Sequence, residues 1–77
     1  MSEPRRIAVL GLARSGRAAA ELALAAGYRV FASDEGDTPA LQEAAEAVRR
    51  AGGEAEVGGH TARRIAECDL LVVSPGI

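Results

Sequence analysis

Residues 7–16, IAVLGLARSG, begin with the continuous apolar run Ile7–Leu10 and pass directly into a turn bounded by Gly11 and Gly16. Such a run is typical of a strand buried in a parallel sheet, and the Ala- and Leu-rich residues after the turn predict a helix. The first backbone N–H groups of a helix have no partners within it, and with the helix dipole they attract anions. The segment therefore predicts a strand, a turn and a helix start that together bind a phosphate group.

The glycine pattern leaves the kind of nucleotide open. In the dinucleotide-binding pattern G-x-G-x-x-G, the second glycine lets the backbone approach the pyrophosphate. This chain has Ala13 at that position. A methyl group there disfavours an ordinary dinucleotide, but it does not exclude a phosphate bound nearer the start of the helix.

Strand and helix patterns alternate along the rest of the sequence. Gly27 is expected to end the first helix, and Thr38 and Pro39 are expected to begin the second. The expected strands cover residues 7–10, 29–33, 54–57 and 70–73, and the expected helices cover residues 15–26, 39–51 and 61–68. This order predicts an α/β fold, a Rossmann-like open parallel sheet with right-handed crossovers and strand order 3-2-1-4.

The first helix is expected to bury one apolar stripe. Ala19, Leu22, Ala23 and Ala26 follow the i, i+3, i+4, i+7 spacing of a single helix face. The sequence thus predicts a single apolar stripe along this helix.

Composition limits the classes of protein to which the chain can belong. Its 77 residues fit one small domain, and 48% hydrophobic and 26% charged residues are typical of a folded protein. The net charge of −2, with both signs interspersed, argues against a nucleic-acid partner and a membrane partner. The sequence has no apolar run of signal-peptide or membrane-spanning length, and Cys68 is its single cysteine, so we expect a cytoplasmic protein without disulfides.

The predicted strand order creates a binding crevice. Strands 1 and 4 become neighbours while their helices lie on opposite faces, and open parallel sheets bind ligands at the carboxyl ends of such strands. The loops covering residues 11–16, 34–38 and 74–76 converge there. These loops also carry the unusual turn residues of the chain, which favours a site built from all three.

Two residues of the first loop could contact a phosphate. Ser15 could add its hydroxyl group to the backbone donors, or it could cap the helix. Arg14 could place a positive charge near a diphosphate, or it could be a solvated loop residue. Gly11 permits the tight turn, and Gly16 permits close packing between helix and strand.

The other two loops supply further candidates. Asp34 ends the second strand 18 residues after Gly16, where an acidic residue accepts hydrogen bonds from a ribose. It could instead cap its own turn. In Ser74-Pro75-Gly76, proline ends the strand and glycine lets the chain approach a ligand.

The other reactive side chains are expected to be structural. His60 follows Gly58-Gly59 in a loop and has no neighbouring metal ligand in the sequence, so neither a metal site nor a catalytic residue is predicted. Cys68 is expected to contribute to packing. The arginine pairs at residues 49–50 and 63–64 are expected to lie on solvated helix faces.

The glycine loop at residues 11–16, Asp34, Thr38-Pro39 and the ending LVVSPGI at residues 71–77 together resemble the N-terminal domain of the Mur ligase family. The resemblance spans essentially the whole chain. It implies an enzyme of three domains, in which the first binds the UDP part of a UDP-linked muramoyl substrate and the second binds ATP and Mg²⁺. The substrate carboxylate becomes an acyl phosphate, which the amine of an amino acid, here D-glutamate, attacks during peptidoglycan precursor synthesis.

The resemblance also implies roles for individual residues. Arg14, Ser15 and Gly16 would lie at the diphosphate, Asp34 and Glu35 at the uridine, and Ser74 and Gly76 beside the uracil. Family members often have a small hydroxyl residue and a basic residue after the strand-2 aspartate. This chain has Glu35 and Gly36 there, which makes the uridine contacts of that loop less certain.

The resemblance implies that residues 1–77 are part of a longer enzyme. All nine basic residues are arginines, so the chain has no lysine for an ATP-binding G-x-x-x-x-G-K-[ST] loop. We therefore expect no ligation by this domain alone, the remaining domains of the same polypeptide as its partners, and an exposed apolar edge at residues 70–73. Two alternatives are an NAD-binding module of an oxidoreductase and a nucleotide-sensing regulatory domain.

Overall fold

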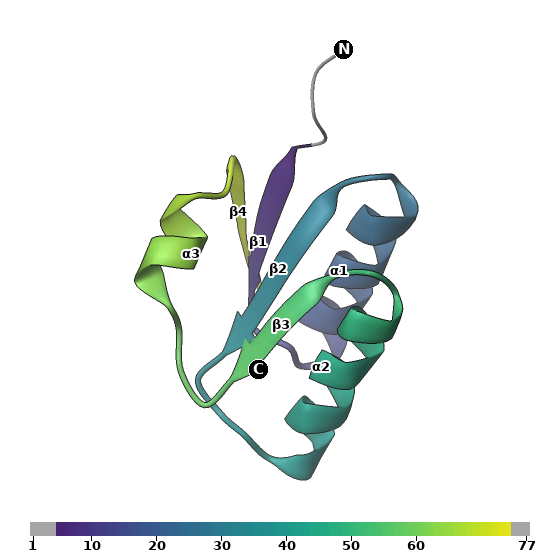
Figure 1. Ribbon diagram of the computed structural model, residues 1–77. Helices are drawn as coiled ribbons and strands as arrows, with labels where there is room; N and C mark the ends of the chain where they lie inside the picture. The colour runs from purple at the N-terminus through teal and green to yellow at the C-terminus, as the bar shows by residue number, and fades with distance from the viewer. Residues whose placement is uncertain (1–4, 75–77) are drawn as a thin grey trace.

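The computed structural model describes residues 5–74 and has the alternating order of strands and helices that the sequence predicts (Figure 1). The elements are β1 (Arg6–Leu10), α1 (Arg14–Ala25), β2 (Arg29–Asp34), α2 (Pro39–Arg50), β3 (Glu54–Val57), α3 (Ala62–Ala66) and β4 (Leu70–Val73). The third helix is shorter at both ends than predicted, whereas β3 and β4 have the predicted bounds.

The four strands form one parallel sheet in the order β3-β2-β1-β4, which confirms the predicted Rossmann-like topology. Helices α1 and α2 lie side by side on one face of the sheet, and α3 lies on the opposite face (Figure 1). Because α3 is the crossover from β3 at one edge to β4 at the other, the carboxyl ends of β1 and β4 become neighbours. This is the position at which the sequence predicts a crevice.

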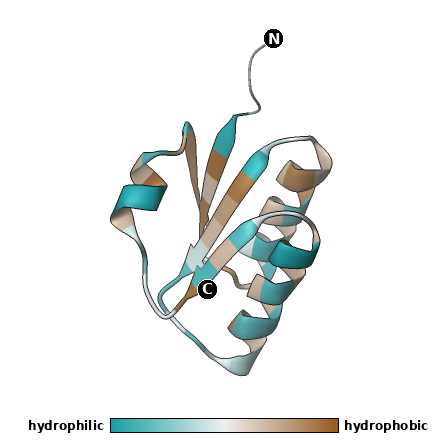
Figure 2. Cartoon of the chain, in the orientation of Figure 1, coloured by the Kyte–Doolittle hydropathy of each residue, from teal (hydrophilic) through white to brown (hydrophobic). Residues whose placement is uncertain are grey.

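The hydrophobic core lies between the sheet and the pair α1 and α2. Alternate residues of each central strand point toward these helices, and Figure 2 shows the apolar residues gathered along β1 and β2. Small side chains dominate this core and let the helices approach the sheet closely. The buried members are Ile7, Val9, Leu12, Ala20, Val30, Ala32, Ala44, Ala45, Val48 and Ala55.

Only part of the apolar stripe predicted for α1 faces the core: Ala23 packs against it, but Leu22 does not, so the helix is rotated about its axis relative to the prediction. Leu22 keeps 73% of its surface exposed, whereas Gly16 and Ala20 are buried and Leu24 packs against the core. The cause lies at Gly16, where an added Cβ would lie 1.8 Å from the carbonyl oxygen of Gly11. This close approach places the Gly16 side of the helix against the sheet. The spacing of apolar residues does not predict this side, because an Ala-rich helix has several faces of nearly equal hydropathy.

Strand β4 lies at the edge of the described sheet, where β1 is its pairing partner. Its four side chains remain 39–64% exposed although all are large and apolar. The exposed apolar edge expected at residues 70–73 is therefore present in the part of the chain that the structure describes. None of the helices within residues 5–74 has the length and apolar character needed to cross a membrane.

Candidate functional site

The turn between β1 and α1 depends on its two glycines. Gly11 has φ +104°, a conformation that residues with a Cβ rarely adopt, and its N–H donates to the Ser33 carbonyl oxygen at 2.7 Å. Gly16 lies so close to this turn that no side chain fits between them. The predicted roles of Gly11 in the turn and of Gly16 in close packing are both confirmed.

The N-terminus of α1 opens toward the carboxyl ends of the strands. Ala13 is the N-cap residue, with extended backbone (φ −65°, ψ −179°), and its methyl group cannot accept a hydrogen bond from the first helical amides. The first helical amides, beginning at Arg14, therefore have neither a helix partner nor a side-chain cap from Ala13. This arrangement suits an anion, as the sequence predicts.

Ser15 and Ser74 meet across the crevice between β1 and β4. Their hydroxyl oxygens lie 2.6 Å apart, and the backbone N–H of Ser74 donates to the Leu10 carbonyl at 2.9 Å. The Ser15 hydroxyl thus pairs with Ser74 instead of capping the helix. The predicted convergence of the first and third loops is confirmed at Ser74, whereas Pro75 and Gly76 lie outside the described residues.

Asp34 connects the second loop to the first. One carboxylate oxygen accepts from the N–H of Leu12 at 2.8 Å, and the other accepts from the N–H of Gly36 at 2.9 Å. The second of these bonds is the turn-capping role weighed from the sequence. Each carboxylate oxygen keeps a second lone pair, so a ribose hydroxyl could still donate to this group.

The other predicted contact residues surround these loops. Arg14 and Glu35 are exposed, and no ion pair involves Arg14 within residues 5–74. Thr38 caps α2 by accepting from the Leu41 N–H at 3.2 Å, with Pro39 in the first turn, as predicted. A cleft of about 640 Å³ lies between α1 and α2 with Arg14 and Thr38 in its lining, so the charge of Arg14 lies beside an open space.

The loop after β3 contributes to the same edge of the sheet, which the sequence did not indicate. Gly58 N–H donates to the Gly36 carbonyl at 2.9 Å, and Gly59 N–H donates to the Asp34 carbonyl at 3.2 Å. His60 is exposed, as expected of a loop residue, but its Nδ1 lies 2.6 Å from the buried hydroxyl oxygen of Ser33. The signal available in the sequence was Ser33 itself, a hydroxyl residue directly after the apolar run Val30–Ala32.

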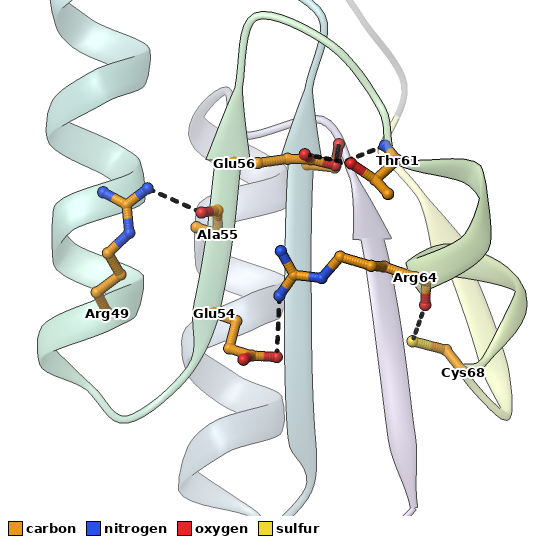
Figure 3. A network of polar contacts seen from close by, with 8 residues as sticks. Arg49, Glu54, Ala55, Glu56, Thr61, Arg64 and Cys68 are labelled. Atoms are coloured by element: carbon orange, nitrogen blue, oxygen red, sulfur yellow. Dashed lines mark hydrogen bonds and ion pairs between the residues drawn. The ribbon is translucent and has the colours of Figure 1, made fainter.

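Glu56 fixes the far end of this loop (Figure 3). Its carboxylate accepts from the backbone N–H and the hydroxyl of Thr61, both at 2.7 Å, and from Ser33 at 3.2 Å. Burial raises the pKa of Glu56, but the hydrogen bonds from Thr61 and Ser33 and the charge of Arg64 outweigh it and hold the pKa below its ordinary value. The group is therefore ionised at neutral pH.

A second, smaller hollow of about 120 Å³ lies beside α3 at the opposite ends of the strands. Arg64 lies over the ring of Phe31 at 4.2 Å and pairs with Glu54 at 3.2 Å, so it is only partly solvated, with 41% of its side chain exposed. The thiol of Cys68 donates to the Arg64 carbonyl at 3.4 Å, and burial raises its pKa (Figure 3). Among residues 5–74, no three His, Cys, Asp or Glu side chains are grouped to hold a metal ion.

A protein-family model described as "Mur ligase MurD-like, N-terminal domain" matches residues 5–77. The chain is 49% identical over 72 residues to a UDP-N-acetylmuramoylalanine--D-glutamate ligase of Salinibacter ruber, covering 94% of this chain and 15% of that protein. Proteins of the same name match at 46% identity in Chlorobaculum parvum (92% of this chain, 15% of that protein) and at 34% in Desulfosudis oleivorans (99% and 17%). The chain thus spans about one sixth of the length of these relatives.

Proposed function

The chain belongs to the MurD-like Mur ligase family, as an N-terminal domain, and on this basis we propose that it binds the UDP moiety of UDP-N-acetylmuramoyl-L-alanine. The observation that carries the proposal is the contact of 2.6 Å between the hydroxyl oxygens of Ser15 and Ser74. It places two hydroxyl groups beside the uncapped N-terminus of α1. Backbone and hydroxyl donors of this kind suit a diphosphate, because its oxygens accept several hydrogen bonds.

The proposed contacts divide the site into two sides. Arg14, Ser15 and the amide of Gly16 bind the diphosphate, where a guanidinium group and helix amides supply positive charge. The nucleoside side holds Asp34 and Glu35 at the uridine, with Ser74 and Gly76 beside the uracil. Asp34 contributes there through the lone pairs that Leu12 and Gly36 leave free.

We propose that the whole protein is a ligase of peptidoglycan synthesis that adds D-glutamate to this substrate with ATP and Mg²⁺. The support is the printed name of the relatives, of which the chain covers 15–17%. The residues present here do not fit the ATP site, because the chain contains no lysine for a phosphate-binding loop. Catalysis would therefore need the remaining domains, and the 77-residue chain by itself would be inactive.

A titration of the 77-residue chain followed by amide NMR tests the binding proposal. UDP should shift the signals of Ser15, Gly16, Asp34 and Ser74, and NAD at equal concentration should not. The alternative of an NAD-binding module predicts the reverse, and shifts with neither ligand would contradict nucleotide binding by the chain.

Two charge-matched variants sharpen this test. Arg14→Gln removes the guanidinium group from the proposed diphosphate side, and binding to UDP should weaken about tenfold or more, since hydrogen bonds to charged groups contribute about 1.5–3 kcal/mol. Arg50→Gln is the control: it removes an equal charge from an exposed residue at the C-terminal end of α2, away from the proposed site. Equal weakening in both variants would indicate a general charge effect and not a contact.

A further inference from the structure

Ser33 lies at the carboxyl end of β2 and is fully buried, although it is a polar residue. Its hydroxyl oxygen has three neighbours within hydrogen-bond distance. These are Glu56 Oε2 at 3.2 Å, the Gly59 carbonyl oxygen at 3.0 Å and His60 Nδ1 at 2.6 Å. All three partners come from β3 and the loop that follows it, so one buried hydroxyl holds the start of this loop.

The number of protons in this cluster determines the tautomer of His60. A serine hydroxyl has one proton, and a carbonyl oxygen can only accept. The Glu56 carboxylate, ionised at neutral pH, also can only accept. If the Ser33 hydroxyl donated to His60 instead, both of these oxygens would face it without a proton between them, so we assign its proton to one of them. The contact of 2.6 Å between Ser33 and His60 then takes its proton from His60 Nδ1. In the neutral ring, Nε2 is then unprotonated.

The loop that His60 anchors also holds the nucleoside side of the proposed site. Gly59 pairs with Asp34 in an antiparallel bridge, and Gly58 donates to the Gly36 carbonyl at 2.9 Å. Asp34 in turn accepts the N–H of Leu12 in the first loop. A continuous path of hydrogen bonds thus runs from His60 through the Asp34–Gly36 loop to the turn that begins α1.

This loop needs an anchor because of its backbone. Gly58 and Gly59 have φ of +83° and +155°, and a pair of glycines loses more conformational entropy on ordering than any other pair of residues. A loop with this composition has little tendency to hold one conformation by itself. Side-chain contacts from its flanks, at Glu56 and His60, therefore determine whether its amides stay against Asp34 and Gly36.

We propose that His60 is a positioning residue for the nucleotide site: its Nδ1–H donates to Ser33, holds residues 58–60 against the Asp34–Gly36 loop, and so fixes the nucleoside side of the site. The effect on affinity rests on the proposed binding of UDP. The tautomer and the anchoring of the loop do not depend on any ligand.

The tautomer is measured directly by long-range ¹H–¹⁵N NMR of the neutral His60 ring in the free 77-residue chain. The expected spectrum has a protonated Nδ1 and an unprotonated Nε2, whereas free histidine prefers the proton on Nε2. In the Ser33→Ala variant the ring loses its acceptor and should return toward the Nε2–H form. A wild-type ring with its proton on Nε2 would overturn the inference.

Two substitutions of His60 by an amide residue test whether a donor at the position of Nδ1 is needed, or whether any polar side chain suffices. An asparagine amide places its N–H near the position of Nδ1, and a glutamine amide places it near that of Nε2. Binding of UDP to His60→Asn should therefore stay close to wild type, and binding to His60→Gln should weaken about fivefold, the effect of losing about 1 kcal/mol. Hydrogen exchange at the Gly58 and Gly59 amides should accelerate in His60→Gln and not in His60→Asn.

The two measurements distinguish failure of the inference from failure of the proposed function. If UDP does not bind the wild-type chain, the proposed function fails, and hydrogen exchange at Gly58 and Gly59 still tests the anchor. If UDP binds and both variants match the wild type in affinity and exchange, His60 has no positioning role.

Discussion

The hydroxyl oxygens of Ser15 and Ser74, 59 residues apart in the sequence, lie 2.6 Å from each other at the carboxyl ends of β1 and β4. One hydroxyl donates to the other, so one proton of the pair remains for an outside acceptor. The pair also joins the first turn of α1 to the residue that follows β4. It is therefore a structural contact, and under the proposed function its free proton is also available to a phosphate group.

Replacing either serine by alanine should affect binding more than folding. Ser15→Ala and Ser74→Ala each remove one exposed hydrogen bond, which should lower the free energy of unfolding by about 1 kcal/mol or less. The affinity for UDP should fall about tenfold in Ser15→Ala, because the hydroxyl on the proposed diphosphate side is lost. It should also fall in Ser74→Ala, because that variant removes the hydrogen bond that orients Ser15 and the proposed contact beside the uracil. Urea denaturation and NMR titration measure the two effects. Unchanged affinity in both variants would remove this pair from the site.

Gly16 is the position of the site that should tolerate substitution least. In Gly16→Ala the new Cβ would lie 1.8 Å from the Gly11 carbonyl oxygen, so α1 must move away from the turn, at a cost of about 4 kcal/mol or more. Gly27→Ala is the matched control. It has φ +93° and open space around it, so it should cost about 1–2 kcal/mol from backbone strain alone. Similar unfolding free energies for the two variants would show that α1 adapts.

Asp34→Asn tests the connection between the first two loops. The variant keeps one acceptor oxygen for the two backbone donors, Leu12 and Gly36, so one partly buried N–H loses its partner and the unfolding free energy should fall by about 1–3 kcal/mol. Hydrogen exchange should accelerate at the Leu12 or the Gly36 amide. Asp37→Asn, in the same loop and exposed, is the control and should leave both amides unchanged.

The topology of the site was predictable because it follows from the order of the elements. Strand order 3-2-1-4 requires the loops after strands 1, 2 and 4 to converge, and Asp34 and Ser74 meet the first loop as this order demands. The rotation of α1 was not predictable. It depends on a backbone contact at Gly16 that the hydropathy of an alanine-rich helix does not encode.

The contact between His60 and Ser33 also could not be predicted from the sequence pattern. A histidine after two glycines indicates a solvated loop, and the path by which that loop returns to β2 depends on glycine conformations that no periodicity specifies. The contacts of Arg64 were not predictable for a related reason. An arginine pair in a short helix indicates a solvated face, whereas the ring of Phe31 on the neighbouring sheet gives the guanidinium group of Arg64 a packing partner.

The stability of the chain should decrease in acid partly through Glu56. Its pKa is lower in the folded chain than its ordinary value of 4.5, so its ionised form stabilises the fold fully above that pH, and the stabilisation is lost as pH falls through the folded pKa. Denaturation at several pH values should show Glu56→Gln less stable than wild type at pH 7, with the difference shrinking below about pH 4.5. The exposed Glu46→Gln is the control, and a difference that is independent of pH would contradict the assignment.

The exposed edge at β4 should make the 77-residue chain associate with itself. Leu71 and Val73 are 53% and 64% exposed on a strand whose outer edge has no partner among residues 5–74, and such edges pair with other strands. Sedimentation should therefore show an average mass that rises with concentration, and Leu71→Lys should reduce this rise because a charge opposes edge pairing. Leu22→Lys, at an exposed apolar residue on α1 away from this edge, is the control. A wild-type chain that stays monomeric at millimolar concentration would contradict association through this edge.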